Sequence, residues 1–313
     1  MAWDQINLQK KLNSTKLNLP KVQTLKSVVA EHVQFQDFII SVPTFNHQGS
    51  ITYKGMELFT QFPEGCFWRP PTDNDGVKQG WMSKVSGVRR KWIQEGLNKL
   101  DIKRDFAYTE SLTEGDYLQI KSEYQGTNAK ATHISVIWAE GNLINFYETF
   151  HIPYEWDDLP RVGMRFEIST EFSDLEWLGR GPLESYPDRC NSQLISRWKS
   201  TVDNQYHPYV VPQENGAHQD TQWFSLINNQ GDQLKFNITN ASSFSASSMH
   251  DMDLSESLII SQLEAKPTTE VHVDAAIRGL GTGACGPDTL EEFRLRSGTY
   301  EMAWSLEVLP AKH

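Results

Sequence analysis

Ten consecutive residues, 67–76, combine two aromatic rings, an arginine, two prolines and an acidic turn. Proline fixes φ and forces the preceding residue into extended backbone, so Arg69-Pro70-Pro71 cannot lie inside a helix. Short polar side chains that bond nearby backbone, followed by a glycine that accepts positive φ, predict a polar loop. That loop consists of Asp73, Asn74, Asp75 and Gly76.

Two interpretations of this loop remain open. It can be a surface turn in which Arg69 and an aspartate form an ion pair. It can also bind a polyhydroxylated ligand, because carboxylates and amides offer many hydrogen-bonding atoms and the rings of Phe67 and Trp68 offer flat faces for a sugar. Composition alone does not decide between them.

A second dense motif covers residues 177–189. Gly179 and Gly181 flank Arg180, so the backbone there can approach another group closely. The polar residues of the motif predict an internal network of arginines and carboxylates that holds a long loop, with ligand contact as the alternative. These residues are Arg180, Glu184, Asp188 and Arg189.

A third motif, residues 207–223, again joins aromatic and proline residues to a polar glycine turn. Glu214 and His218 suggest an acid–base pair, although a hydrogen-bonded structural pair is the more common arrangement. A fourth motif, residues 279–288, contains Gly-x-Gly-x-Gly. It lacks the following lysine and the βαβ context of a phosphate loop, so we expect backbone pressed close to a ligand or another chain.

The segments between these motifs predict an all-β protein. Alternating runs such as residues 117–124, 133–138 and 143–152 are typical of antiparallel strands with one solvated face. Residues 33–42, 258–260 and 293–295 also predict strand. One short helix is expected within residues 81–97, because its apolar residues recur near helical spacing.

Length and composition limit the classes of protein to which this chain can belong. The 313 residues allow one large β domain or two smaller ones, and the net charge of −11 argues against nucleic acid or an anionic membrane as main partners. Cys66, Cys190 and Cys285 are widely spaced, so free thiols and no metal site are expected. The sequence shows neither a signal peptide nor a membrane span, which favours the cytoplasm, although a periplasmic fragment would also fit.

Residues 1–28 differ from the rest. They contain one alternating stretch, Ala2 to Leu8, followed by a segment rich in Lys, Asn and Leu. A single strand does not fold alone, so this segment is expected to end a preceding domain or to dock elsewhere. The predicted organisation is therefore an appendage over 1–28 and a main domain over 29–313.

The four motifs, in order and spacing, resemble the C-terminal domain of the β-galactosidases of glycoside hydrolase family 2, which also occurs as a separate small chain. The resemblance covers essentially the whole chain. It implies a large antiparallel β-supersandwich like that of galactose mutarotases. It also makes Ala2 to Leu8 similar to the last strand of a preceding immunoglobulin-like domain.

The resemblance implies that this chain forms part of an enzyme that hydrolyses terminal β-D-galactosides such as lactose with retention. The two catalytic glutamates and the Mg and Na sites would lie on a TIM-barrel region outside this chain, so the chain alone is expected to be inactive. Its expected partners are that catalytic region or large chain, the β-galactoside, and further subunits of an oligomer.

The resemblance also implies roles for particular residues. The expected substrate-binding residues edge the sugar site, with Gly76 as the hinge of a mobile loop and Cys285 where other members have an aromatic platform. They are Asp73, Asn74, Asp75, Gly76 and Cys285. The expected loop-supporting residues are Arg69, Arg180, Glu184, Asp188, Arg189, Glu214 and Asn215. Two other hypotheses remain: a stand-alone galactose-binding or mutarotase-like domain, and a domain that serves only subunit assembly.

Overall fold

The computed structural model describes residues 32–43, 49–79, 87–109, 116–281 and 288–311. Within these residues the strands form three sheets, and every strand pairing is antiparallel. The predicted all-β class is therefore confirmed. The predicted boundary between 28 and 29 lies outside the described residues, so it stays a prediction. None of the described helices is long and apolar enough to cross a membrane.

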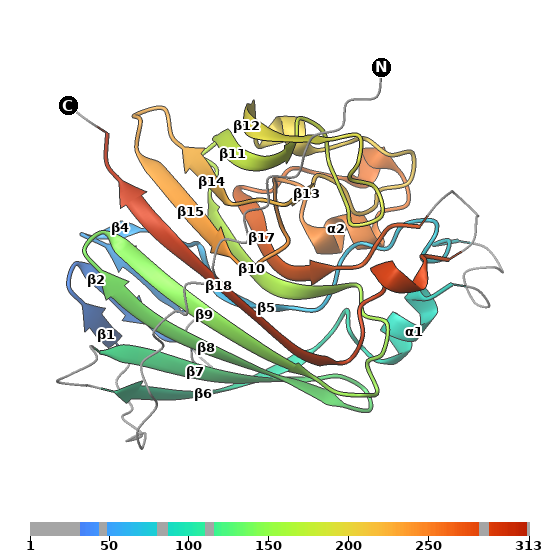
Figure 1. Ribbon diagram of the computed structural model, residues 1–313, viewed down its shortest axis with the longest axis horizontal. Helices are drawn as coiled ribbons and strands as arrows, with labels where there is room; N and C mark the ends of the chain where they lie inside the picture. The colour runs from blue at the N-terminus through green and yellow to red at the C-terminus, as the bar shows by residue number, and fades with distance from the viewer. Residues whose placement is uncertain (1–31, 44–48, 80–86, 110–115, 282–287, 312–313) are drawn as a thin grey trace.

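The largest sheet has nine strands and curves through the whole molecule (Figure 1). Its strands, in spatial order, are β12 (Leu194–Thr201), β11 (Asp174–Gly181), β14 (Trp223–Ile227), β15 (Gln233–Thr239), β18 (Gly298–Leu309), β9 (Leu143–Ile152), β8 (Lys130–Glu140), β7 (Tyr117–Gln125) and β6 (Asp101–Thr109). Buried and partly exposed residues alternate along β8 and β9, as the sequence predicted.

Two smaller sheets accompany the large one. The five-stranded sheet has the order β13 (His218–Gln219), β16 (Ser243–Ser247), β17 (Thr268–Ile277), β10 (Arg161–Ser169) and β5 (Gln61–Cys66). The four-stranded sheet runs from β1 (His32–Phe35) through β2 (Phe38–Ser41) and β3 (Ser50–Tyr53) to β4 (Met56–Glu57). The five-stranded sheet contributes most to the site described below, because β10 and β17 carry its buried charges.

Aromatic rings fill the space between the nine-stranded and five-stranded sheets. Trp304 of β18 stacks on Phe146 of β9, with ring centroids 3.9 Å apart and planes 4° from parallel. Trp304 also stacks against Phe166 of β10, with centroids 5.4 Å apart. All three side chains are buried, so this stack joins the two sheets through apolar contact.

Helices and short turns correct several sequence predictions. The predicted helix is α1 (Arg89–Gln94), and residues 81–86 of the predicted range lie outside the described part. A second short helix, α2 (Asp251–Glu256), was missed because six residues are too few for a periodic pattern. Residues 258–260 and 293–295, predicted as strands, are not strands and overlap the 3₁₀ turns η3 (Ile260–Gln262) and η4 (Glu291–Phe293). A further 3₁₀ turn is η2 (Asp203–Gln205).

The β-rich run 33–42 is a hairpin rather than one strand. Gln36 has φ 52°, in the left-handed region, so the chain reverses at Gln36–Asp37. Phe35 and Phe38 pair across the turn, and both are buried. Strict alternation would have put these two residues on opposite faces, so the turn lets both enter the core.

Candidate functional site

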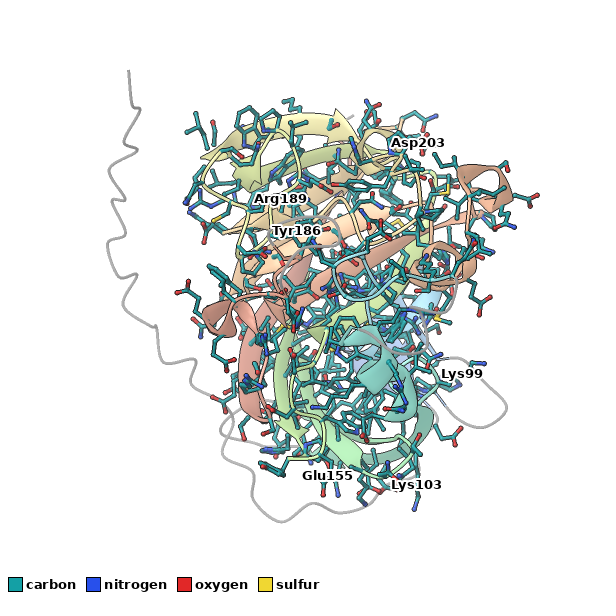
Figure 2. All side chains as sticks on the ribbon, turned by 90° about the vertical axis from the view of Figure 1, so that its right-hand side faces the viewer. Lys99, Lys103, Glu155, Tyr186, Arg189 and Asp203 are labelled. Carbon is teal, nitrogen blue, oxygen red and sulfur yellow. The ribbon has the colours of Figure 1, made fainter. Side chains whose placement is uncertain are left out.

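The four motifs meet at one end of the molecule, which Figure 2 shows face on with Tyr186 and Arg189 labelled. Backbone contacts join them directly. The Glu214 amide N–H donates to the Pro70 carbonyl at 3.2 Å, and the Ser185 amide N–H donates to the Ala217 carbonyl at 2.7 Å. The Asn74 side chain donates to the Leu280 carbonyl at 3.0 Å. Segments up to about two hundred residues apart therefore form one loop cluster.

Asp75 holds the Asp73–Gly76 loop from inside. Its carboxylate is fully buried and accepts hydrogen bonds from the Thr72 amide at 2.8 Å and the Thr72 hydroxyl at 3.0 Å. Arg69 donates to the same carboxylate at 3.0 Å, as the ion-pair interpretation of this turn requires. In this conformation the Asp75 carboxylate is enclosed, so contact with a sugar would require the loop to open.

Two other residues of this loop lie nearer the surface, while Gly76 is buried. Asp73 and Asn74 are half-buried, and the Asp73 amide donates to the Gln213 side chain at 3.3 Å. Gly76 has φ 135°, a conformation that side-chain-bearing residues rarely adopt. A hinge at Gly76 and sugar binding by the loop stay predictions. Cys285 lies outside the described residues, so its predicted place in the site stays untested.

Arg278 is a second buried cation in this loop base, and the sequence analysis missed it. Its guanidinium donates to both Asp158 oxygens, at 2.6 and 3.1 Å, and to Asp75 at 3.2 Å. The guanidinium groups of Arg69 and Arg278 both lie over the Trp92 ring, at 5.4 and 5.8 Å from its centroid. Helix α1 thus supplies the aromatic face on which the loop base rests.

Asp188 ties the second motif to the fourth. Its two carboxylate oxygens accept from the Leu280 amide at 3.0 Å and the Gly281 amide at 2.7 Å. A Cβ on Gly279 would lie 2.7 Å from the Asp188 carboxyl carbon, so glycine is required there. The predicted close backbone approach therefore exists, and the group approached at this position is a carboxylate of the same chain.

Glu184 and Arg189 hold the second and third motifs together. Glu184 accepts from the Arg189 guanidinium, from the Tyr209 hydroxyl at 2.5 Å and from the Gly216 amide at 2.8 Å. Asn215 accepts from the His207 amide at 3.0 Å. These contacts match the internal network of arginines and carboxylates that the sequence analysis favoured over ligand contact for this motif.

Arg180 and Lys78 donate hydrogen bonds to further backbone carbonyls. Arg180 donates to the carbonyls of Cys190 and Gln193 and to Asp220 at 2.5 Å. Lys78, close to the first motif, donates to the carbonyls of Pro212, Leu254 and Ser257. Burial lowers the pKa of Lys78 to about 8. The ammonium thereby links the first motif to the third motif and to α2.

The deepest part of the cluster is a set of carboxylates around Arg161. This guanidinium lies 2.8 Å from Asp251, 3.1 Å from Glu214 and 3.1 Å from Asp274, and its side chain is fully buried. Burial opposes the charge of Arg161, but the three acids raise its pKa well above the usual value. The sequence offered one signal for it, a charge inside the apolar run 159–164.

Glu214 and His218 do not form the suggested acid–base pair. Glu214 accepts from Arg161 at 3.1 Å and from the Tyr186 hydroxyl at 3.2 Å. His218 instead contacts the Gln205 side chain at 2.7 Å and the Arg180 carbonyl at 3.1 Å, and its ring packs on Trp177 at 4.4 Å. Burial in this largely aromatic surrounding lowers the pKa of His218 to about 4. The ring is therefore neutral at pH 7.

Glu214 gives the chain a pH-dependent stability. Burial raises its pKa from 4.5 to about 7 against the attraction of Arg161. Between these pH values the folded chain holds a proton that the unfolded chain has lost, so this contribution to the free energy of unfolding falls as pH rises. The slope is at most about 1.4 kcal/mol per pH unit. Glu214→Gln should remove this pH dependence, as measured by urea unfolding from pH 5 to 8.

Glu307→Gln is the matched control, because Glu307 pairs with Lys235 at 3.7 Å in a partly exposed position. This variant should keep the pH dependence of the unmodified chain. Equal slopes for the Glu214→Gln variant and the unmodified chain would contradict the assignment.

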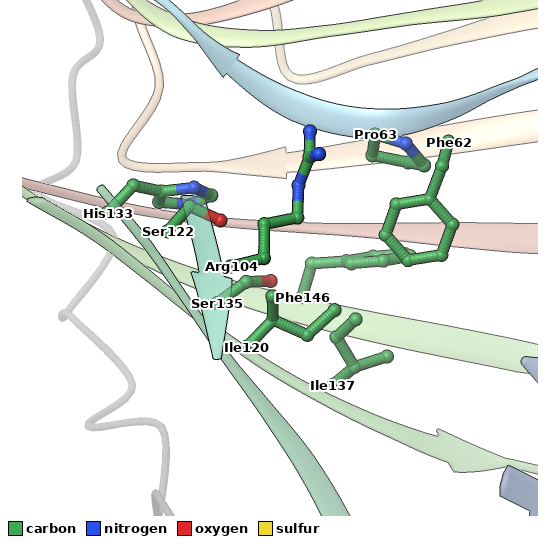
Figure 3. Close-up of a pocket in the computed structure, with 9 residues that line it drawn as sticks. All are labelled: Phe62, Pro63, Arg104, Ile120, Ser122, His133, Ser135, Ile137 and Phe146. Atoms are coloured by element: carbon green, nitrogen blue, oxygen red, sulfur yellow. The ribbon is translucent and has the colours of Figure 1, made fainter. Parts of the chain in front are cut away.

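Cavities of very different size lie in the described part. One of about 290 Å³ is lined by Glu184 and Arg189 of the second motif, by His207 of the third, and by residues between the two motifs such as Tyr206. Another, of about 230 Å³, lies between α1 and α2 and includes Lys78. Figure 3 shows a third, of about 10 Å³, between Phe62 of β5 and strands β7 to β9. That space fits about one water molecule, so it cannot hold a sugar.

A family model described as beta galactosidase small chain matches residues 44–306, which include all four motifs. The chain belongs to the β-galactosidase small-chain family. Curated relatives agree: it is 27% identical to a β-galactosidase of Kluyveromyces lactis over 98% of this chain. It is also 27% identical to one of Arthrobacter sp. over 81% of this chain and 24% identical to one of Actinobacillus pleuropneumoniae over 98%.

The alignments cover 30%, 26% and 30% of those three β-galactosidases, so this small-chain domain corresponds to less than a third of their length. Among solved structures, a putative aldose 1-epimerase of Escherichia coli K12 matches 90% of the chain with a TM-score of 0.44 and 10% identity. A galactose mutarotase-like protein of Lactobacillus casei matches 89% with a TM-score of 0.36 and 10% identity.

Proposed function

We propose that this small-chain domain completes the substrate pocket and the assembly of a retaining β-galactosidase of glycoside hydrolase family 2. The substrate would be a terminal β-D-galactoside such as lactose. The two catalytic glutamates, and the Mg and Na sites of the complete enzyme, belong to a catalytic region outside this chain. The domain's own loops would edge the sugar through Asp73, Asn74, Gly76 and Cys285, and through Asp75 once the loop opens.

This proposal rests on the contacts that the acidic side chains of the loop cluster make. Retaining hydrolysis needs two carboxylates about 5–5.5 Å apart, one of them free to attack the sugar. Asp75 and Glu214 are buried on arginines, while Glu184 and Asp188 accept from backbone amides. These four acids therefore support loops, which favours catalytic acids that lie elsewhere. Membership of the small-chain family supports the same division.

The test combines this chain with the catalytic region of a β-galactosidase. The purified chain alone should not hydrolyse nitrophenyl β-galactoside, because the proposal places both catalytic acids outside it. Adding the catalytic region should produce hydrolysis that depends on the amount of chain added. Release of nitrophenol is the measurement.

Heat-denatured chain is the control and should restore nothing. Robust hydrolysis by the pure chain would overturn the proposal. If neither activity appears, a calorimetric titration with galactose separates the alternatives: binding by the isolated chain would favour a stand-alone galactose-binding or mutarotase-like domain.

A further inference from the structure

A histidine and two glutamates come together where the start of α2 meets the five-stranded sheet, beside the Arg161 cluster. Glu167 of β10 and Glu270 of β17 are directly paired across the antiparallel ladder. His250 is the residue at the N-terminal end of α2. One ligand atom from each of the three residues lies within 4.8 Å of the other two. Like charges directly opposite each other destabilise a sheet unless a cation lies between them.

The proton of His250 is fixed by its surroundings. Its Nε2 lies 3.2 Å from the Thr268 carbonyl oxygen, which can only accept, so Nε2 carries the proton. Nδ1 then presents a lone pair, and it lies 3.7 Å from Glu167 Oε1. A histidine that donates one ring N–H to a backbone carbonyl and points the other nitrogen at carboxylates has the arrangement of a metal ligand.

Hydrogen bonds also orient the two glutamate carboxylates. The Thr268 hydroxyl donates to Glu167 Oε2 at 2.6 Å, which leaves Oε1 facing His250. The Asp251 amide donates to Glu270 Oε1 at 2.7 Å, which leaves Oε2 available. Arg165 lies 3.9 Å from Glu270 Oε2 but is held by Glu64 at 2.5 Å, and His272 Nε2 lies 3.5 Å from Glu270 Oε1.

From this geometry we propose that Glu167, His250 and Glu270 bind a divalent transition-metal ion such as Zn²⁺. One nitrogen and two carboxylate oxygens suit this ion, with water in the fourth position. The side chains of Glu167 and His250 are 19% and 13% exposed, so an ion can reach the site from solvent. The ligands need to close by roughly an ångström to reach bonding distances of about 2.0–2.2 Å.

The neighbouring group of Cys66, Asp251 and His272 fits a metal less well, although its ligand atoms also lie within 4.8 Å. Arg161 Nη1 lies 3.1 Å from His272 Nδ1, and a guanidinium can only donate, so Nδ1 accepts. His272 Nε2 carries a ring proton and lies 3.3 Å from Asp251 and 3.5 Å from Glu270, so neither ring nitrogen offers a lone pair to a metal. The ion is therefore assigned to His250 and not to His272.

The proposed ion would join β10, β17 and the start of α2. Helix α2 contributes Asp251 to the Arg161 cluster, and the Leu254 carbonyl on the same helix accepts from Lys78. A metal at this position therefore stabilises the elements behind the loop cluster. The expectation of no metal site rested on the spacing of the cysteines. No short motif joins the three proposed ligands, which lie up to about a hundred residues apart in the chain.

The test uses the full chain after treatment with EDTA and removal of the chelator. Titration with ZnCl₂ should show one ion bound per chain, and metal analysis after gel filtration should agree. His250→Gln and Glu167→Gln should each weaken Zn²⁺ binding at least tenfold. In thermal melts, Zn²⁺ should raise the Tm of the unmodified chain and leave that of the two variants almost unchanged, which also checks that both variants fold.

Two controls separate this site from others. His151→Gln removes an exposed histidine that contacts Thr299, and it should bind Zn²⁺ like the unmodified chain. Cys66→Ser should also retain binding. The proposal is overturned if the unmodified chain binds no Zn²⁺, if both His250→Gln and Glu167→Gln bind with unchanged affinity, or if Cys66→Ser alone abolishes binding.

Discussion

Replacing Arg161 by methionine is expected to lower the free energy of unfolding by about 3–5 kcal/mol. The guanidinium is fully buried and is shared by Glu214, Asp251 and Asp274. Methionine fills much of the same volume but leaves these acids without their common cation. Because native proteins are stable by only about 5–15 kcal/mol, a loss of this size should appear as a large shift of the urea midpoint.

Arg197→Met is the matched control, because Arg197 pairs with Glu176 but is 63% exposed. Exposed ion pairs contribute at most about 1 kcal/mol, so this variant should unfold close to the unmodified chain. Similar midpoints for the two variants would show that burial of the Arg161 cluster does not determine its contribution. A loss confined to the Arg161 variant would confirm that the buried cluster stabilises the fold more than an exposed pair does.

Asp188→Ala is expected to reduce kcat/KM of the assembled enzyme by about 10- to 100-fold, because misplacing a pocket element by an ångström can cost that much. Asp188 accepts from the amides of Leu280 and Gly281 and so fixes the base of the fourth motif. Alanine removes both acceptors. The Asp188 side chain is only half-buried, so the fold should survive the change. Steady-state kinetics with nitrophenyl β-galactoside measures the effect.

Asp37→Ala serves as the control for this experiment. Asp37 also pairs with a cation, Lys54 at 3.3 Å, but it lies in the β1–β2 turn and is about half exposed. The control should keep full activity in the assembled enzyme. If Asp188→Ala does so too, the fourth motif does not position the substrate, and the hypothesis of a domain that serves only assembly gains support.

Where local chemistry fixes the backbone, sequence and structure agree closely. The long alternating runs became β7, β8 and β9, because one face of each strand packs in the core. Shorter elements were harder to predict. Helix α2 has six residues, and the run 33–42 contains a turn whose left-handed Gln36 has no sequence signature as strong as Asn-Gly.

The sequence by itself determined the all-β class and the four polar motifs, because proline, glycine and short acidic residues restrict backbone locally. The ion pair of Arg69 with Asp75 could also be anticipated, since six residues separate them. Only the tertiary structure decided which acids meet which cations. Arg161 and Arg278 acquire their partners from strands and loops far away in the chain, and His250 meets Glu167 across two elements. Such pairings depend on strand register and sheet order, which local sequence does not encode.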